Sequence, residues 1–173
     1  EGAEAARTLG WPLVLKRRKL GYDGKGNATV HGPGDIPAAW QKLDGDHAPL
    51  LVEQFCPFER ELAVMVTRGL DGGSVVYPVV DTVQKDHICH TVTAPARLEQ
   101  AAALGQRAAE AIQGVGSIGI ELFLLRDGTI VINEMAPRVH NSGHYTIEAC
   151  VCSQFENHIR AVLGWPLGSP ALR

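Results

Sequence analysis

The stretch that decides the fold runs from Ser117 to Glu134, SIGIELFLLRDGTIVINE, in which two apolar runs flank Arg126-Asp127-Gly128. An Asp-Gly pair between alternating hydrophobic runs is a strong signal for a β-hairpin. If Asp-Gly forms a two-residue loop, the register sets Glu121 directly opposite Glu134. The sequence therefore predicts an antiparallel hairpin with two carboxylates facing each other.

Two opposed carboxylates, with Cβ atoms about 5 Å apart, repel each other and destabilise a hairpin. A hard divalent cation such as Mg²⁺ between them would reverse that sign, because it favours carboxylate oxygens. Asn133 adds an amide oxygen beside the pair. The alternative is that both glutamates are solvated on an exposed face. Phe123 shares their face and the run is strongly apolar, so we favour a metal site formed by Glu121 and Glu134.

The segment after the hairpin, Met135 to Gly143, has neither a helical nor a strand period, yet it is rich in polar side chains. Loops on a rigid hairpin often carry functional residues, and this one brings Arg138, His140 and His144 into the neighbourhood of the carboxylates. An alternative is a zinc hydrolase in which His140 and His144 are metal ligands. Their i, i+4 spacing allows it, but Ser-Gly between them disfavours a continuous helix.

A glycine-rich segment, Gly21-Tyr22-Asp23-Gly24-Lys25-Gly26, lies between two short predicted strands. Its spacing matches neither the dinucleotide-binding fingerprint nor the P-loop. A glycine loop of this kind can direct backbone N–H groups at phosphates, and Lys16 and Lys25 would add positive charge. The alternative is a flexible connection with unrelated lysines.

Composition narrows the class of protein. The chain has 173 residues, 45% of them hydrophobic, which suits one domain or two small lobes with a real core. A net charge of −3 argues against a nucleic-acid-binding surface, and no apolar run is long enough to span a membrane. Cys56, Cys89, Cys150 and Cys152 form no C-x-x-C pair, which indicates reduced thiols of a cytoplasmic protein rather than a zinc or redox motif.

Hydrophobic periodicity predicts helices over residues 2–9, 35–43, 97–113 and 146–163, the last in two pieces near Ser153. Besides the hairpin, strands are predicted over residues 13–15, 28–30, 50–55, 61–67, 74–80 and 87–92. Asp35 is expected to cap the second helix. Because the strands form hairpins rather than βαβ units, we expect an α+β fold with antiparallel sheets.

Several motifs together resemble the ATP-grasp superfamily, and within it the family of 5-(carboxyamino)imidazole ribonucleotide synthases, the ATP-dependent part of phosphoribosylaminoimidazole carboxylase. The motifs are VLK (14–16), GYDGKGN (21–27), EQ (53–54), ELAVM (61–65), NEMAPRVHNSGHYT (133–146), SQFE (153–156) and GWPLG (164–168). The run 133–146 is the most specific, because other ATP-grasp enzymes share its Asn-Glu but not its Arg-x-His-Asn-Ser-Gly-His. Residues 85–89 and 94–97 look most like the fungal branch.

The resemblance implies an ATP-grasp fold, mainly antiparallel sheets with flanking helices, and an ATP-grasp ligase that uses ATP and Mg²⁺. The implied reaction is the carboxylation of 5-aminoimidazole ribonucleotide with bicarbonate, through carboxyphosphate, in de novo purine biosynthesis. It implies a small lobe over residues 1–48 with the glycine-rich flap, and a large lobe over residues 49–173 with the metal and carboxyphosphate site. The family's N-terminal and C-terminal domains would be absent, so we expect the isolated chain to be weakly active or inactive. The full-length enzyme is expected to be a homodimer or larger homo-oligomer, with a fused carboxylase domain in the fungal branch.

The resemblance also assigns roles to residues of this sequence. Mg²⁺ would be held by Glu121 and Glu134, which agrees with the hairpin register. Bicarbonate and then carboxyphosphate would be held by Arg138, His140 and Asn141. The ribonucleotide would contact Tyr22, Asp23, Lys25 and His144. ATP would contact Lys16, Gly21, Gly24, Gly26, Glu53, Gln54, Phe55, Cys56, Glu61, Gln84, Asn133 and Glu134.

The sequence departs from the family pattern at two of these positions. Lys25 stands where the family commonly has arginine, and Gln84 where it commonly has histidine. Two other readings remain: an ATP-grasp carboxylase or ligase with a different acceptor, which the loop from Arg138 to His144 argues against, and an inactive nucleotide-binding domain. The intact Lys16, Glu121 and Glu134 argue against the second.

Overall fold

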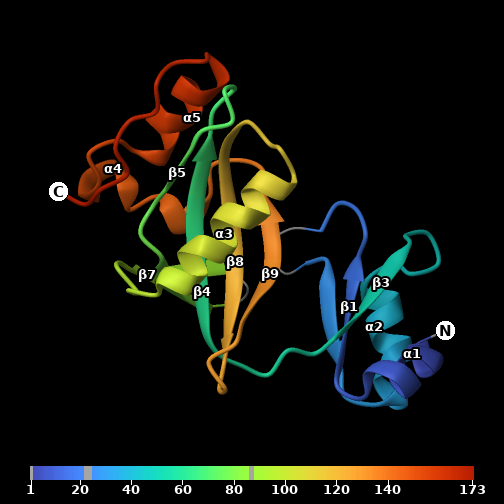
Figure 1. The fold of residues 1–173 in the computed structure, drawn as a ribbon. Coiled ribbons are helices and arrows are strands. Elements are labelled where there is room, and N and C mark those ends of the chain that lie inside the picture. Colours follow the sequence, from blue (N-terminus) through green and yellow to red (C-terminus); the bar gives the residue numbers. More distant parts are fainter. Residues whose placement is uncertain (1, 22–24, 86–87) are drawn as a thin grey trace. The chain divides into compact units, whose positions relative to one another are not determined.

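The computed structural model describes residues 2–21, 25–85 and 88–173. The chain divides into two compact units, Glu1–Pro57 with Asp86–Ile88, and Phe58–Lys85 with Cys89–Arg173 (Figure 1). The boundary between the two lobes is predicted after residue 48, whereas in the structure the strand over residues 50–54 still belongs to the first unit. Each unit has its own sheet and its own core, so each is described separately.

The first unit is built on a three-stranded antiparallel sheet in the order β2-β1-β3. Its elements are α1 (Gly2–Leu9), β1 (Leu13–Arg17), β2 (Asn27–Val30), η1 (Pro33–Asp35), α2 (Ile36–Lys42) and β3 (Leu50–Gln54). One face of the sheet packs on the helices, with a core of Leu13, Leu15, Ala28, Val30, Ala39 and Leu43. Because side chains alternate along a strand, Lys16 of β1 lies on the opposite face, and so does Glu53 of β3, whose pairing partner is Val14.

The second unit contains a six-stranded sheet in the order β7-β6-β4-β8-β9, with β5 also pairing with β4. Its elements are β4 (Phe58–Arg68), β5 (Ser74–Val76), β6 (Val80–Lys85), β7 (Ile88–Thr93), α3 (Glu99–Ala111), β8 (Gly116–Leu125), β9 (Ile130–Ala136), η2 (Asn141–Gly143), α4 (Thr146–Ala149) and α5 (Gln154–Val162). The pairings of β4 with β5, β6 and β8, and of β8 with β9, are antiparallel. The antiparallel α+β architecture predicted from the sequence is confirmed.

The two faces of this sheet have different coverings. Helix α3 lies across one face (Figure 1), where alternate residues of β4 and β8 pair as Leu62 with Leu122, Val64 with Ile120 and Val66 with Ile118. The opposite face is partly covered by the α4–α5 region, through the buried cluster of Met65, Tyr77 and Cys150. The remainder of that second face carries Glu61 and Glu121, which follow the same strand alternation.

The β8–β9 hairpin reaches the predicted opposition of Glu121 and Glu134 by a different route. Its loop has three residues, not two, since Leu125 N–H bonds the carbonyl of Thr129 and Gly128 adopts φ +85°. This turn shifts the register by one, so Leu122 pairs with Ile132. A β-bulge then shifts it back, leaving Asn133 as the extra residue on β9.

The bulge places two consecutive residues opposite one. In a regular strand, neighbouring side chains point to opposite faces, so Asn133 and Glu134 could not both face Glu121. Here Asn133 and Glu134 together oppose Glu121, and the Asn133 side chain hydrogen-bonds the Glu121 carboxylate. Met135, the next residue, packs against the α3 side of the sheet.

Two local predictions are corrected by the structure. Asp35 stands at the start of α2 but its side chain makes no cap; instead its carboxylate accepts a hydrogen bond from His31 N–H at 2.8 Å. The strand predicted over residues 74–80 ends at Val76, as β5, and a further strand that was not predicted, β6, begins at Val80. Pro78 has no N–H to give to the ladder, and the register with β4 changes by one residue across it.

The other sequence-level predictions concern membranes and cysteines. The longest described helix, α3, spans 13 residues, and none of the described helices has the length and apolar character that a membrane crossing requires. All four cysteines are free thiols.

The predicted break near Ser153 separates α4 from α5, and the Ser153 hydroxyl caps α5 by accepting from Glu156 N–H at 3.1 Å.

Candidate functional site

Glu121 and Glu134, opposed on the β8–β9 hairpin, form an acidic pair in the second unit. Burial, followed by the carboxylates of Glu134 and Glu61, raises the pKa of Glu121 from 4.5 to about 7. The Asn133 amide and the Arg138 guanidinium act in the opposite direction. Burial and like charge both penalise the ionised form, so a cation bound at this pair would favour that form by opposing the repulsion.

A third carboxylate, Glu61, comes from the neighbouring strand β4. Its pairing partners are Phe123 of β8 and Thr82 of β6, both on the face that carries Glu121. The Phe123 ring stacks on Phe58 with centroids 4.3 Å apart, which gives this face an apolar floor beside the acids.

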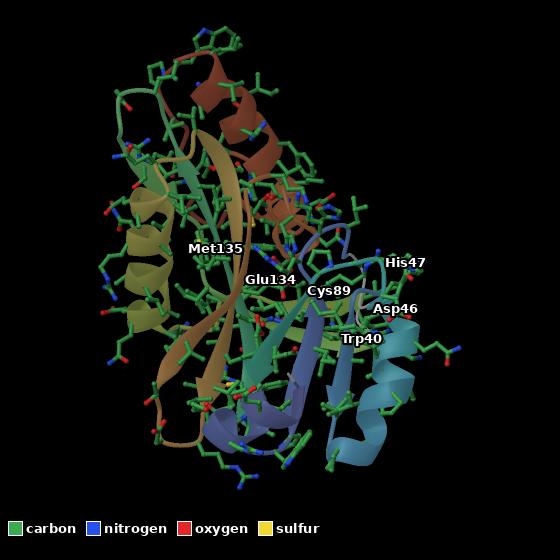
Figure 2. All side chains as sticks on the ribbon, turned by 90° about the vertical axis from the view of Figure 1, so that its right-hand side faces the viewer. Trp40, Asp46, His47, Cys89, Glu134 and Met135 are labelled. Atoms are coloured by element: carbon green, nitrogen blue, oxygen red, sulfur yellow. The ribbon has the colours of Figure 1, made fainter. Side chains whose placement is uncertain are left out.

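Cys89 of β7 belongs to the same neighbourhood, although no pattern in the sequence pointed to it as a site residue. Burial raises the pKa of the Cys89 thiol, and the carboxylates of Glu121 and Glu61 raise it further. Figure 2 shows Cys89 on the side of the sheet toward which Glu134 points, away from Met135. Alternation along residues 87–92 shows which side chains share a face with Cys89. It does not show that this face is the one with the glutamates, because that depends on the order of the strands in the sheet.

His140 is held against strand β8 at a position where the strand has no side chain. A Cβ on Gly119 would lie 2.6 Å from the His140 Cβ, so glycine is required for this approach. The His140 Nε2 atom lies 3.5 Å from Glu121 Oε1, and Nδ1 lies 2.9 Å from Ser142 Oγ. Burial lowers the pKa of His140, with smaller contributions from Arg138 and His144, so the site disfavours the protonated imidazole.

The other polar residues of the loop after β9 surround His140. Arg138 is exposed, and its guanidinium donates to the Val139 carbonyl at 3.0 Å. It is near enough to lower the pKa of both Glu121 and His140. Asn141 is exposed at the start of η2, and His144 packs against the Phe155 ring with centroids 5.7 Å apart. The loop therefore places one cation and several donors next to the acidic pair.

These residues fit Mg²⁺ better than zinc. Among the residues described in the structure, no group of three or more His, Cys, Asp or Glu side chains could hold a metal ion. A closed all-protein zinc site needs four such ligands, and His140 and His144 do not form one. Mg²⁺ is commonly held by one or two carboxylates and completes its shell with water and substrate phosphates, which suits Glu121 and Glu134.

In the first unit, the structure brings together Lys16 and Glu53. The Lys16 amine and the Glu53 carboxylate form an ion pair with a 2.6 Å separation on the face of the sheet away from the helices. Their side chains are 25% and 39% exposed, so both remain accessible.

The predicted glycine loop is described only at its base. Gly21 and Lys25 are exposed and Gly26 is buried. The Gly26 carbonyl accepts from Arg17 N–H at 2.8 Å, which closes the connection between β1 and β2. The predictions for Tyr22, Asp23 and Gly24 lie outside the described residues.

The remaining predicted contacts follow β3 or lie on β6. Gln54 is exposed and ends β3, and Phe55, 36% exposed, donates its N–H to the Pro12 carbonyl at 3.2 Å. Burial raises the pKa of the Cys56 thiol. Gln84 is half-buried on β6, two residues beyond Thr82 and on the same face.

A sequence model described as the ATP-grasp domain matches residues 1–155. The chain belongs to the ATP-grasp family. The fold expected from the resemblance, antiparallel sheets with flanking helices, is that of this ATP-grasp domain.

Named relatives and solved structures are similar to the ATP-grasp domain over almost all of its length. Phosphoribosylaminoimidazole carboxylase of Schizosaccharomyces pombe is 53% identical over 169 residues, which is 94% of this chain and 30% of the relative. The structure of carboxyaminoimidazole ribonucleotide synthase from Aspergillus clavatus complexed with ATP superposes with TM-score 0.88 at 43% identity, covering 98% of this chain and 45% of that one. The same enzyme in complex with ADP and 5-aminoimidazole ribonucleotide gives TM-score 0.88 at 41% identity, covering 97% and 44%. The chain thus spans less than half of the proteins it resembles.

Proposed function

We propose that this chain is the ATP-grasp part of a 5-(carboxyamino)imidazole ribonucleotide synthase. The enzyme would join bicarbonate to the amine of 5-aminoimidazole ribonucleotide at the expense of ATP, a step of purine biosynthesis. The observation that carries this proposal is the opposed pair Glu121 and Glu134 beside a loop with a fixed cation, Arg138. The names of the relatives support the same activity.

The metal is proposed to bind between Glu121 and Glu134, with the Asn133 amide oxygen as a neighbouring donor. The hard oxygen donors and the raised pKa of Glu121 support this assignment. When bound, Mg²⁺ would neutralise negative charge on the phosphoryl group that is transferred. The protein's own part is to hold both carboxylates on one face, which the bulge at Asn133 does.

Nucleotide contacts are proposed separately for each unit. In the first unit, Lys16 would bind phosphate oxygens together with backbone N–H groups of Gly21, Gly24 and Gly26, while Glu53, Gln54, Phe55 and Cys56 would contact the base. In the second unit, Glu61 would accept from ribose hydroxyls, and Gln84 and Asn133 would add polar contacts. The Lys16–Glu53 ion pair supports the first assignment, because it holds the lysine amine in one place before a phosphate arrives.

Bicarbonate is proposed to bind Arg138, His140 and Asn141. A guanidinium donates two parallel hydrogen bonds to a planar oxyanion, and the two other side chains can donate to the remaining oxygen. A bicarbonate oxygen would attack the γ-phosphorus of ATP, ADP would leave, and the carboxyphosphate formed would pass its carboxyl group to the substrate amine with release of phosphate. Tyr22, Asp23, Lys25 and His144 are the proposed contacts of the ribonucleotide.

The test needs the flanking domains that the longer relatives carry. A chimaera would replace the matched segment of the Schizosaccharomyces pombe relative by residues 1–173, and ADP and carboxylated ribonucleotide would be measured in one reaction. We expect ADP formation that depends on 5-aminoimidazole ribonucleotide and bicarbonate, with product formed in equal amount. Turnover with another amine acceptor but not with this ribonucleotide would indicate a different ligase, and nucleotide binding without turnover would indicate an inactive domain.

A further inference from the structure

The side-chain amide of Gln154, at the start of α5, makes a two-point contact with the backbone of His140. Its Oε1 atom accepts from His140 N–H at 3.0 Å, and its Nε2 atom donates to the His140 carbonyl at 2.8 Å. Gln154 is fully buried. A primary amide offers a donor and an acceptor side by side, so it can bond one residue's N–H and C=O as a neighbouring strand would.

Gln154 is itself fixed by hydrogen bonds to two other elements, α4 and β8. Its backbone N–H donates to Thr146 Oγ1 at 3.0 Å, and its carbonyl accepts from Ser117 Oγ at 2.9 Å. Ser117 Oγ lies 2.8 Å from Thr67 Oγ1, which connects the chain of bonds to strands β8 and β4. All of these side chains are buried, so the network is shielded from water. In the protein interior, hydrogen bonds are stronger and unpaired polar groups are more costly than in water.

The space around this amide is also filled on the loop side. A Cβ on Gly143 would lie 2.7 Å from Gln154 Oε1 and 2.7 Å from Met65 Cγ. The Thr146 hydroxyl donates to the Gly143 carbonyl at 2.6 Å, which holds this part of the loop in place. The amide therefore sits in a close-fitting slot, and its position sets the position of His140.

We infer that Gln154 is a positioning residue that fixes the His140 backbone, and through it the loop Arg138–His144, beside the acidic pair on β8 and β9. The inference rests on the proposed function in one respect, that this loop binds bicarbonate. On this inference, Gln154 does not touch the reacting groups. It nevertheless controls how tightly ATP use is coupled to carboxylation. If the groups that bind bicarbonate were not held in place, ATP would be hydrolysed without formation of the carboxylated product.

The chain contains a matched control. Asn157, one turn further along α5, is also fully buried and makes the same kind of two-point contact, donating to the Gly168 carbonyl at 3.0 Å and accepting from Gly168 N–H at 2.7 Å. Gly168 lies in the C-terminal segment, and a Cβ placed on it would meet Cys152 and Asn157. The Asn157 amide also donates to the Tyr77 hydroxyl at 2.7 Å, so Asn157→Leu removes at least as many buried hydrogen bonds as Gln154→Met at similar volume. Faster amide exchange at residues 139–144 in Gln154→Met alone therefore reports on the segment that is clamped.

The first experiment measures amide hydrogen exchange in the 173-residue chain. Gln154→Met should speed exchange at residues 139–144 by tenfold or more, whereas Asn157→Leu should leave those amides within twofold of wild type and affect residues near Gly168. If Gln154→Met does not fold, Gln154→Asn serves, since it keeps the polar amide but is one methylene too short to hold both the N–H and the carbonyl of His140. Equal exchange at residues 139–144 in the Gln154 and Asn157 variants would overturn the inference.

The second experiment measures carboxylated product per ADP in the chimaera. Gln154→Met should lower this ratio at least tenfold with the Kd for ATP within twofold of wild type, and Asn157→Leu should keep the wild-type ratio. An unchanged ratio in an active chimaera would overturn the positioning role, whatever the exchange data show. If the wild-type chimaera makes no carboxylated product, the proposed function fails, and the exchange comparison alone decides whether Gln154 fixes the loop.

Discussion

Replacing Glu121 by glutamine should stabilise the metal-free chain at alkaline pH. Each pKa unit corresponds to about 1.4 kcal/mol, and the pKa of Glu121 rises from 4.5 to about 7 on folding. The ionised side chain therefore costs the folded state about 3 kcal/mol. A quarter of the side chain is exposed, so water screens part of this cost. We expect Glu121→Gln to gain about 2 kcal/mol at pH 8.

The pH dependence gives the sign of the effect. Below pH 4.5 Glu121 is neutral in both the folded and the unfolded chain, so glutamine brings no electrostatic gain. Between pH 4.5 and about 7 the unfolded chain ionises first, and the stability of the wild type relative to the variant falls as pH rises. Above about pH 7 the difference is constant.

The assay is urea unfolding of the wild type and Glu121→Gln at pH 4 and pH 8 without divalent cations. Glu59→Gln is the control, because Glu59 is exposed on the same sheet and its replacement should change stability little at either pH. Equal effects of Glu121→Gln at the two pH values, or a loss of stability at pH 8, would refute the electrostatic account of this pair.

Three further predictions concern ligands. Glu134→Gln should abolish Mg-ATP turnover in the chimaera while circular dichroism stays that of the wild type, and most activity retained at saturating Mg²⁺ would contradict the metal assignment. ATP or a non-hydrolysable analogue should slow amide exchange at Lys25 and Gly26, and unchanged rates at saturating nucleotide would argue against phosphate binding there. Arg138→Lys keeps the charge but loses the planar fork, so it should leave ATP affinity nearly unchanged and cut carboxylation by roughly 10²-fold. Phosphate release should then exceed product, and a one-to-one ratio at full rate would remove Arg138 from the anion site.

The hairpin shows how far the sequence could predict this site. The alternating apolar runs and the Asp-Gly pair correctly predicted that Glu121 and Glu134 are opposed. The two-residue loop on which that register was based is wrong, because Gly128 takes the left-handed position of a three-residue loop. The bulge at Asn133 then restores the opposition. Local patterns encode a hairpin well, but a bulge follows from packing across several strands and leaves no periodic signal.

Gln154 marks the limit of such reasoning. It lies at the first turn of a correctly expected helix, and nothing in its spacing distinguishes it from a surface glutamine. Its role depends on His140, fourteen residues earlier, and on Ser117 of β8. Contacts of this kind appear only when the helix is placed on the sheet. The division after Pro57 was missed for the same reason, because β3 joins the first sheet by pairing with β1.

The bulge at Asn133 also has a consequence for protein engineering. The register of the acidic pair is maintained by the residue pairs that follow the bulge and by the long pairing of β8 with β4. It does not depend on the length of the loop at the tip of the hairpin. The tip, Arg126 to Gly128, is exposed. A peptide tag or a fluorescent reporter inserted there would lengthen the connection without changing which residues face Glu121. The tip is therefore the place to attach a label for following ligand binding at this hairpin.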